Sequence, residues 1–181
     1  MPGLVQSIHA FLATPTQDVD GRVKPGHDGH PLSFSFTLRL YRAGDEDAAI
    51  ALWQRTWQQA YPQIDFAGRV GWWRERWRNE LVANAAIVVA EQNGALIGFV
   101  TIDASGYLDQ LVVHPDHWGS PLAKTLVDEA KRLSPSGITL VVNEDNVRAI
   151  RFYERNGFVH AGEDVNPASG RPVLKMAWTK S

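Results

Sequence analysis

The stretch HPDHWGSPLAKTL, residues 114–126, contains residue types that can bind a phosphate. It follows an apolar, strand-like run and leads into a helical pattern. Free backbone N–H groups and the helix dipole converge where a strand turns into a helix, and Gly119 allows a tight turn there. Ser120 is a good helix cap, and Pro121 suits the first helical position, where its missing N–H costs nothing. The stretch predicts either an anion site or a capped helix without a ligand.

Other residue types point away from metal binding and covalent catalysis. The chain has no cysteine, which excludes disulfides, thiolate metal sites and a cysteine nucleophile. No serine lies in a G-x-S-x-G turn. His114 and His117 flank Pro115 in a loop, and HDGH at residues 27–30 lies in a polar segment, so both are poor metal ligand sets. We expect no metal.

A second stretch, LVVNEDNVRAIRFYERNGF at residues 140–158, predicts a strand followed by a helix. Asn146 suits the helix cap, Ala149 and Ile150 face inward, and Gly157 ends the helix. Tyr153 lies on this helix beside Phe152.

Together the two stretches resemble the GCN5-related N-acetyltransferase (GNAT) family. LVVHPDHWGSPLAKTLVDEA is similar to the family's strand, pyrophosphate loop and helix, and NxxAxxFYxxxGF is similar to its next motif. Residues 36–180 fit the family's order of elements. The family loop reads Gln or Arg, two residues, Gly, one residue, then Gly or Ala. Only Ala123 conforms, whereas Trp118 and Pro121 replace the polar residue and the central glycine. We therefore expect coenzyme A to bind there more weakly or in a different pose.

The resemblance implies acetyl-coenzyme A as co-substrate. Its pantetheine arm would lie like an extra strand between LDQLVV and TLVVN, paired with the backbone of Leu111 and Val113, and one of those N–H groups would polarise the thioester carbonyl. Asn143 or Asn146 could meet the arm from the other side, although strand-end and capping roles explain both asparagines equally. The residues expected to hold the co-substrate are Leu111, Val112, Val113, Trp118, Gly119, Ser120, Leu122, Ala123, Asn143 and Asn146.

The implied reaction is direct attack of a primary amine on the thioester. The departing thiolate needs a proton, and Tyr153 matches the family's position for that acid, although a core tyrosine explains it too. An alkyl amine is only about 0.1% neutral at pH 7, so a base or a proton-draining water chain helps. A period of two puts Asp109 on the face of Leu111 and Val113, which makes it the first candidate base, with a solvent-facing carboxylate as the alternative. Weaker candidates are Glu144, Asp145 and His114.

The two helices before the hairpin would wall the acceptor pocket of such an enzyme. Most of their tryptophans recur at core spacing, whereas Trp72 breaks the stripe and could line a site with nearby arginines. We expect acetyl transfer to a primary amine of a small molecule. Alternatives are acetylation of a protein amine, a longer acyl donor, and a catalytically silent coenzyme A-binding or protein-interaction module.

These residues must be positioned by alternating strands and helices. The order of elements is β-α-α-β-β-β-α-β-α-β-β, in which Asn93–Gly94 marks a hairpin. It predicts an α/β fold of the acyl-CoA N-acyltransferase type, with a mixed, mostly antiparallel central sheet of about seven strands and helices on both faces. Residues 35–181 form this domain, whereas residues 1–34 read as a flexible leader rich in Gly, Pro, Asp and His.

Composition bounds the partners. A net charge of −2 on 181 residues gives no basic footprint, so nucleic acid is not expected. No apolar run reaches the roughly 20 residues that span a bilayer, and the start lacks the pattern of a signal peptide. We expect a cytoplasmic protein without a membrane partner. The last two strands leave a homodimer open.

Overall fold

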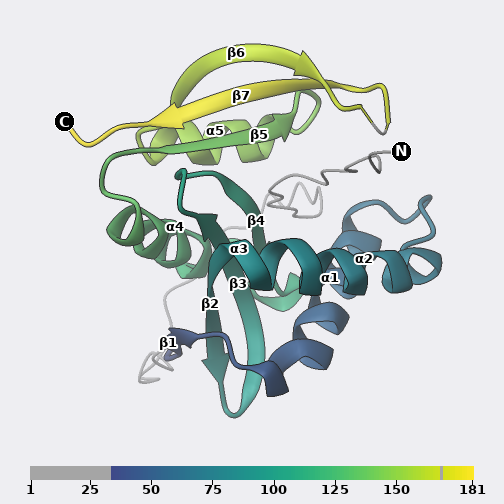
Figure 1. The fold of residues 1–181 in the computed structure, drawn as a ribbon. Coiled ribbons are helices and arrows are strands. Elements are labelled where there is room, and N and C mark those ends of the chain that lie inside the picture. Colours follow the sequence, from purple (N-terminus) through teal and green to yellow (C-terminus); the bar gives the residue numbers. More distant parts are fainter. Residues whose placement is uncertain (1–33, 168) are drawn as a thin grey trace, which may run out of the picture.

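The computed structural model describes residues 34–167 and 169–181, which form an α/β fold with two antiparallel sheets (Figure 1). The predicted leader lies outside these residues except for Phe34. The strands are β1 (Thr37–Leu40), β2 (Ala85–Gln92), β3 (Ala95–Asp103), β4 (Leu108–Val113), β5 (Ile138–Asn143), β6 (Val159–Val165) and β7 (Pro172–Trp178). The α-helices are α1 (Glu46–Ala60), α2 (Val70–Arg76), α3 (Val82–Asn84), α4 (Leu122–Leu133) and α5 (Val147–Arg155).

The first sheet has the strand order β1-β2-β3-β4. Strands β2 and β3 are joined by the predicted two-residue turn, in which Asn93 and Gly94 have φ values of 52° and 79°. Positive φ at both positions gives the turn the twist that suits a hairpin. The hairpin prediction is confirmed.

The second sheet has the order β5-β7-β6, so the seven strands do not form the single sheet that the sequence predicted. An isolated parallel bridge between Tyr107 and Thr139 links β4 to β5, where the Thr139 N–H donates to the Gly106 carbonyl at 2.9 Å. Gly106 has a φ of 83°, and a Cβ there would lie 2.5 Å from the Gly137 carbonyl oxygen, so glycine is required. Beyond this point β4 and β5 diverge (Figure 1).

Helices cover both faces of the first sheet, as predicted. Helices α1 and α2 bury one apolar cluster against it, in which Trp53 and Trp73 stack with ring centroids 4.5 Å apart. Helix α4 buries the opposite face, and α5 joins the same cluster through Ala149 and Tyr153. The tryptophans at core spacing, Trp53, Trp57, Trp73 and Trp77, are all buried, so their core interpretation is confirmed.

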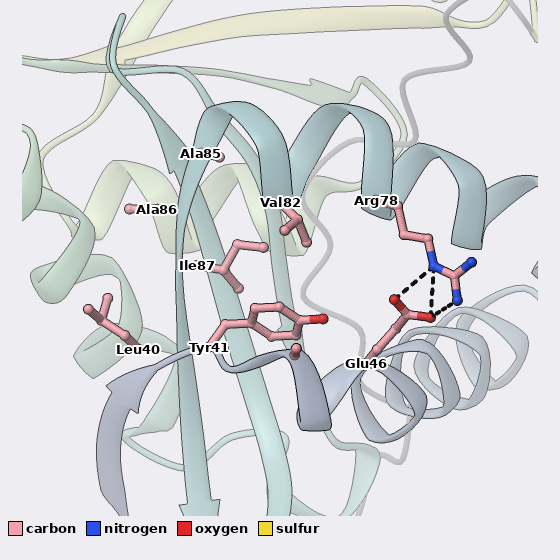
Figure 2. A pocket seen from close by; sticks show the side chains of 9 residues that line it. Leu40, Tyr41, Glu46, Arg78, Val82, Ala85, Ala86 and Ile87 are labelled. Atoms are coloured by element: carbon pink, nitrogen blue, oxygen red, sulfur yellow. Dashed lines mark hydrogen bonds and ion pairs between the residues drawn. The ribbon is translucent and has the colours of Figure 1, made fainter.

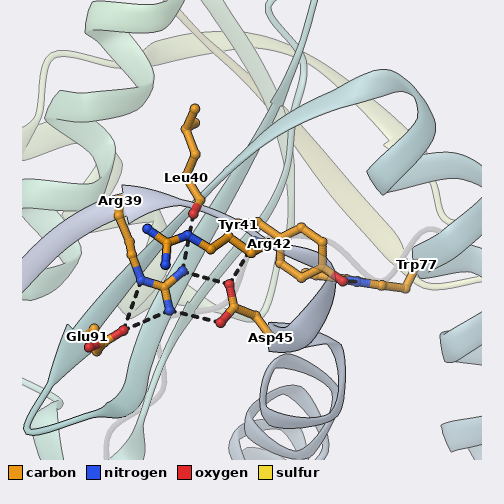
Figure 3. A network of polar contacts seen from close by, with 7 residues as sticks. All are labelled: Arg39, Leu40, Tyr41, Arg42, Asp45, Trp77 and Glu91. Carbon is orange, nitrogen blue, oxygen red and sulfur yellow. Dashed lines mark hydrogen bonds and ion pairs between the residues drawn. The ribbon is translucent and has the colours of Figure 1, made fainter.

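Short edge strand β1 is held by an ion-pair network (Figure 3). Arg39 binds Asp45 and Glu91, each at 2.7 Å, and so ties β1 to β2 and to the turn before α1. Tyr41 extends the network by accepting a hydrogen bond from Trp77 Nε1 at 3.2 Å. The network orients α1 and the segment after α2 on the sheet.

Candidate functional site

The turn before α4 has the cap predicted from the sequence. Pro121 has helical backbone angles directly before Leu122, and Ser120 Oγ accepts a hydrogen bond from the Leu122 N–H at 3.3 Å. Gly119 has a φ of 82°, and no atom lies within 4 Å of where its Cβ would stand. The space over the turn is therefore open.

Three backbone donors at this helix end have no acceptor among the described residues: the N–H groups of Gly119, Ala123 and Lys124. The Ser120 N–H is used within the turn, because it donates to His117 at 3.2 Å, and the Leu122 N–H is used by the cap. Free donors at the positive end of a 12-residue helix suit a pyrophosphate. Pro121 removes one donor, and Lys124, which the sequence did not single out, supplies another.

Trp118 does not take the place of the polar residue that usually opens this loop. Its indole turns inward, donates from Nε1 to the Val113 carbonyl at 2.8 Å and packs against both apolar clusters. The Thr56 hydroxyl donates to the same carbonyl at 3.4 Å. The side chain of Trp118 therefore fixes the end of β4.

The outer edge of β4 faces the opening between the two sheets. The His114 N–H donates to the Ile97 carbonyl at 2.8 Å, so by strand alternation the Val112 backbone also points to β3, and those of Leu111 and Val113 point to the open edge. The predicted pairing groups of Leu111 and Val113 thus lie where an extended ligand could reach them, except that the Val113 carbonyl is already occupied. Val112 is not brought to this edge.

Asp109 lies elsewhere than a strict period of two predicts. Thr101 opposes both Asp109 and Gln110, because the register shifts from Val100↔Leu111 to Ile102↔Leu108. This β-bulge turns Asp109 toward α2, where Arg76 holds its two oxygens at 3.1 and 2.5 Å. Both carboxylate oxygens are therefore engaged by a guanidinium, and the alternative of a solvent-facing carboxylate is excluded because Asp109 is buried.

Two buried polar atoms of α5 and its cap have no partner among the described residues. Asn146 Oδ1 caps the helix by accepting from the Ala149 N–H at 3.1 Å, as predicted, but its Nδ2 has no partner among the described residues. Tyr153 is fully buried, and its hydroxyl also has none. Burial raises the pKa of Tyr153 far above its usual value, so the phenol is protonated. Seven residues apart, the two side chains share one helix face.

A polar group buried without a partner is costly, so these two atoms indicate a missing ligand. Asn146 Nδ2 is a donor, and the Tyr153 hydroxyl both donates and accepts. The amide oxygens and sulfur of a pantetheine thiol offer what both atoms lack. Together with the free N–H groups before α4 and the open edge of β4, the residues present fit acetyl-coenzyme A.

Asn143, at the end of β5, adjoins a cavity of about 120 Å³. Its Nδ2 donates to the Tyr61 hydroxyl at 3.3 Å. The walls come from α1, the α1–α2 connection, the end of β5 and the β6–β7 loop. They comprise Trp57, Tyr61, Ile64, Phe66, Arg69, Asn143, Asn166, Ser169 and Arg171. Trp72, the aromatic residue that the sequence placed at the acceptor site, is not among them.

Of the weaker base candidates, Glu144 and Asp145 line one cavity with Arg171 and Pro172, whereas His114 directly follows β4. Asp145 pairs with Arg171 at 3.1 Å, and Glu144 is exposed. His114 Nδ1 accepts a hydrogen bond from the Asp116 N–H at 3.1 Å, and burial together with nearby Arg55 lowers the pKa of its imidazole. None of them lies at the cavity beside Asn143.

A larger cavity, of about 550 Å³, lies between β1, β2 and the segment after α2 (Figure 2). Leu40, Tyr41 and Val82 line it, and the ion pair between Glu46 and Arg78 borders it. None of the predicted site residues lines it, so a substitution there is a control for one at the cavity beside Asn143.

Residues 34–167 and 169–181 contain neither a metal-binding cluster of side chains nor a membrane-spanning helix. No cluster of three or more His, Asp or Glu side chains is placed to hold a metal ion. No helix in these ranges has the length and apolar character to cross a bilayer.

Relatives with known names share most of this chain. Peptidyl-lysine N-acetyltransferase YiaC of Escherichia coli strain K12 is 30% identical over 144 residues, covering 78% of this chain and 95% of its own. Peptidyl-lysine N-acetyltransferase YjaB of Salmonella typhimurium is 29% identical over 136 residues, covering 75% and 91%.

A solved structure shares the fold. PaiA N-acetyltransferase from Thermoplasma acidophilum, in complex with coenzyme A, aligns with a TM-score of 0.69 at 21% identity, over 81% of this chain and all of its own. The model of the acetyltransferase (GNAT) family matches residues 46–158. The chain therefore belongs to the acetyltransferase (GNAT) family, and the acyltransferase class and the acetyl-coenzyme A co-substrate predicted from the sequence are confirmed with it.

Proposed function

We propose that this acetyltransferase modifies the ε-amine of lysine side chains in proteins. The carrying observation is the narrow cavity beside Asn143, walled by Trp57, Tyr61 and Phe66. Aromatic walls suit the aliphatic stem of lysine and the cation at its end. The names of the two curated relatives support the same acceptor class. The small-molecule amine predicted from the sequence is the alternative that the experiment must separate.

The co-substrate supplies an acetyl group activated as a thioester. In the proposal, the free N–H groups of Gly119, Ala123 and Lys124 hold its pyrophosphate, and Asn146 Nδ2 donates to its pantetheine arm. The Leu111 N–H, on the open edge of β4, donates to the thioester carbonyl, where negative charge develops.

Proton transfers complete the proposed step. The amine nitrogen forms the C–N bond and the C–S bond breaks, while Tyr153 gives its proton to the departing sulfur and regains one from solvent. A protonated phenol suits this role. The amine proton leaves through the mouth of the cavity to solvent, because the predicted base, Asp109, has both oxygens on Arg76.

Two arginines at the rim of this cavity give it a positive edge. Arg171 is paired with Asp145, whereas Arg69 has no carboxylate partner among the described residues and lies 5.6 Å from the Phe66 ring centroid. We expect lysines with an acidic neighbour to be preferred over lysines with a basic neighbour.

The test measures thiol release from acetyl-coenzyme A with a set of amines. An N-terminally blocked peptide with one lysine should be acetylated, and the same peptide with arginine in its place should not. Free lysine and polyamines at equal concentration should react at least tenfold more slowly, measured as kcat/KM. Faster reaction with a small amine would overturn the lysine proposal. Calorimetric titration separately detects acetyl-coenzyme A binding, and its absence at millimolar concentration would overturn the enzyme proposal and favour a protein-interaction module.

A cavity-filling variant locates the acceptor. Ile64→Trp should raise the KM for the peptide severalfold and leave acetyl-coenzyme A binding unchanged, because Ile64 lines the cavity beside Asn143. Val82→Trp, in the larger cavity of Figure 2, is the matched control and should change neither quantity. Equal effects of both variants would argue against this acceptor site.

A further inference from the structure

We propose that Arg76 and Asp109 are positioning residues: their buried ion pair fixes the β4 bulge and thereby aims the Leu111 N–H at the thioester. The inference concerns acetyl transfer itself and does not depend on which amine accepts the group.

The ion pair is closely built and nearly inaccessible. Arg76 is 4% exposed and Asp109 12% exposed at their side chains. Two parallel hydrogen bonds join them, and the guanidinium carbon lies 5.3 Å from the Trp73 ring centroid. The Arg76 guanidinium binds both oxygens of Asp109 and packs on the Trp73 indole. It therefore fixes the orientation of the carboxylate as well as balancing its charge.

Both residues of the bulge are held by hydrogen bonds to side chains. Gln110 Nε2 donates to Asp109 Oδ1 at 2.8 Å, and the Gln110 N–H donates to the Thr101 hydroxyl at 3.0 Å. Thr101 and Gln110 are fully buried. The ladder hydrogen bonds are disrupted at a bulge, so these side-chain contacts determine its shape.

The bulge directly precedes the residue whose N–H faces the open edge. Leu111 pairs with Val100 immediately after the register shift, so the peptide between Gln110 and Leu111 begins the regular part of β4. A rotation of that peptide would redirect the Leu111 N–H. Asp109 therefore lies two residues before the N–H group that the ion pair controls, and its carboxylate is turned toward Arg76.

The helical backbone around Arg76 is also unusual. A π-helical segment, Trp77–Leu81, begins directly after it, and Arg76 Nε donates to Glu80 Oε2 at 3.0 Å within that segment. π-Helical turns are rare and occur frequently at functional sites. The wide turn gives Arg76 a partner on its outer side while its fork remains on Asp109.

The test compares variants that keep or lose the fork. Asp109→Asn, Arg76→Lys and the double variant Arg76→Met with Asp109→Leu are assayed for kcat, for the KM of acetyl-coenzyme A, and for amide hydrogen exchange at Gln110. Arg78→Met is the matched control, because Arg78 pairs with Glu46 on α1, away from Asp109 and the bulge.

Positioning predicts a specific pattern. The folded double variant should lose at least tenfold in kcat with its KM changed less than threefold, because the Leu111 N–H acts on charge that develops in the transition state. Arg76→Lys should fall between this variant and the wild type, exchange at Gln110 should accelerate, and the pH profile of kcat should keep its shape. Arg78→Met should match the wild type.

Three results would overturn the proposal. Wild-type kcat in the double variant would show that the pair does not position the bulge. Loss of the rising limb of the pH profile in Asp109→Asn, with Arg76→Lys unaffected, would instead assign Asp109 as the base. If no amine proves to be an acceptor, unchanged exchange at Gln110 in the double variant also refutes the positioning role.

Discussion

Helices α2 and α5 differ in how their buried polar groups are satisfied. Beside α2, Arg76 and Asp109 satisfy each other at 2.5 to 3.1 Å. Beside α5, Asn146 Nδ2 and the Tyr153 hydroxyl are buried with no partner among the described residues. A completed pair can serve as scaffold, whereas unpartnered groups are free to meet a ligand. The contrast separates the residues that we propose to support the site from those that we propose to contact the substrate.

Not every buried polar atom without a partner marks a ligand site. The indole N–H groups of Trp53 and Trp73 also lack partners among the described residues, but both indoles lie within the stacked aromatic cluster under α1 and α2. Their surroundings are apolar rings, so they do not mark an opening for a ligand.

The largest expected effect follows from removing one partner of the Arg76–Asp109 ion pair. Arg76→Met leaves Asp109 buried and uncompensated, so the free energy of unfolding should fall by about 3–5 kcal/mol. Urea denaturation measures it. The double variant with Asp109→Leu should recover most of that loss, because no charge is left unpaired. A single variant that loses less than about 1 kcal/mol would mean that the carboxylate is solvated.

The next largest effect concerns the Tyr153 hydroxyl, which has no partner among the described residues. Tyr153→Phe should lower kcat at least tenfold, which corresponds to about 1.4 kcal/mol or more in the barrier. Its melting temperature should stay close to that of the wild type, since the hydroxyl makes no hydrogen bond that the variant would lose. Steady-state kinetics and thermal unfolding measure the two quantities. Unchanged turnover would remove Tyr153 from the mechanism.

Asn146 sharpens the comparison, because its two amide atoms have different roles. Asn146→Ala removes the cap oxygen and should cost about 1 kcal/mol of stability. Asn146→Ser keeps a capping oxygen but has no amide donor, so it should retain stability while coenzyme A binds severalfold more weakly by calorimetry. Wild-type affinity in Asn146→Ser would show that Nδ2 does not contact the ligand.

The smallest effect concerns a pair far from the opening. Hydrogen bonds from Arg78 and Arg74 lower the pKa of Glu46 to about 2. Because the folded-state pKa is depressed, the stabilisation is complete above the unfolded value of about 4.5 and is lost as the pH falls toward 2. The stability difference between wild type and Glu46→Gln should therefore be constant near neutral pH and vanish near pH 2. A difference that persists at pH 2 would contradict this assignment.

Local patterns predicted much of the fold. The hairpin at Asn93–Gly94, the caps at Ser120 and Asn146 and the core tryptophans all depend on neighbours within a few residues, which a sequence displays. The division into two sheets was not predicted, because it depends on how β4 and β5 diverge after one bridge at Tyr107 and Thr139. Nothing in either strand's own pattern encodes that angle.

The site was predicted less completely, for the same reason. Arg76 was one of several arginines on a helix, and only the bulge at Asp109 and Gln110 selects it as the partner of the carboxylate. The alternation that placed Asp109 beside Leu111 holds for a regular strand and fails by one residue at a bulge. The inward turn of Trp118 was equally hidden, because its partner is a backbone carbonyl.

The close contact of Gly106 with Gly137 joins the two sheets at one end of the opening between them. The contact has no room for a side chain at Gly106, so even a small substitution there would force the two strands to shift. Val113 and Asn143 lie at the other ends of β4 and β5, which are strands about 17–20 Å long. A shift of tenths of an ångström at the glycine contact therefore becomes a larger change in the distance between Val113 and Asn143. The width of the opening at Val113 and Asn143 thus depends on two glycines at the opposite end of the strands.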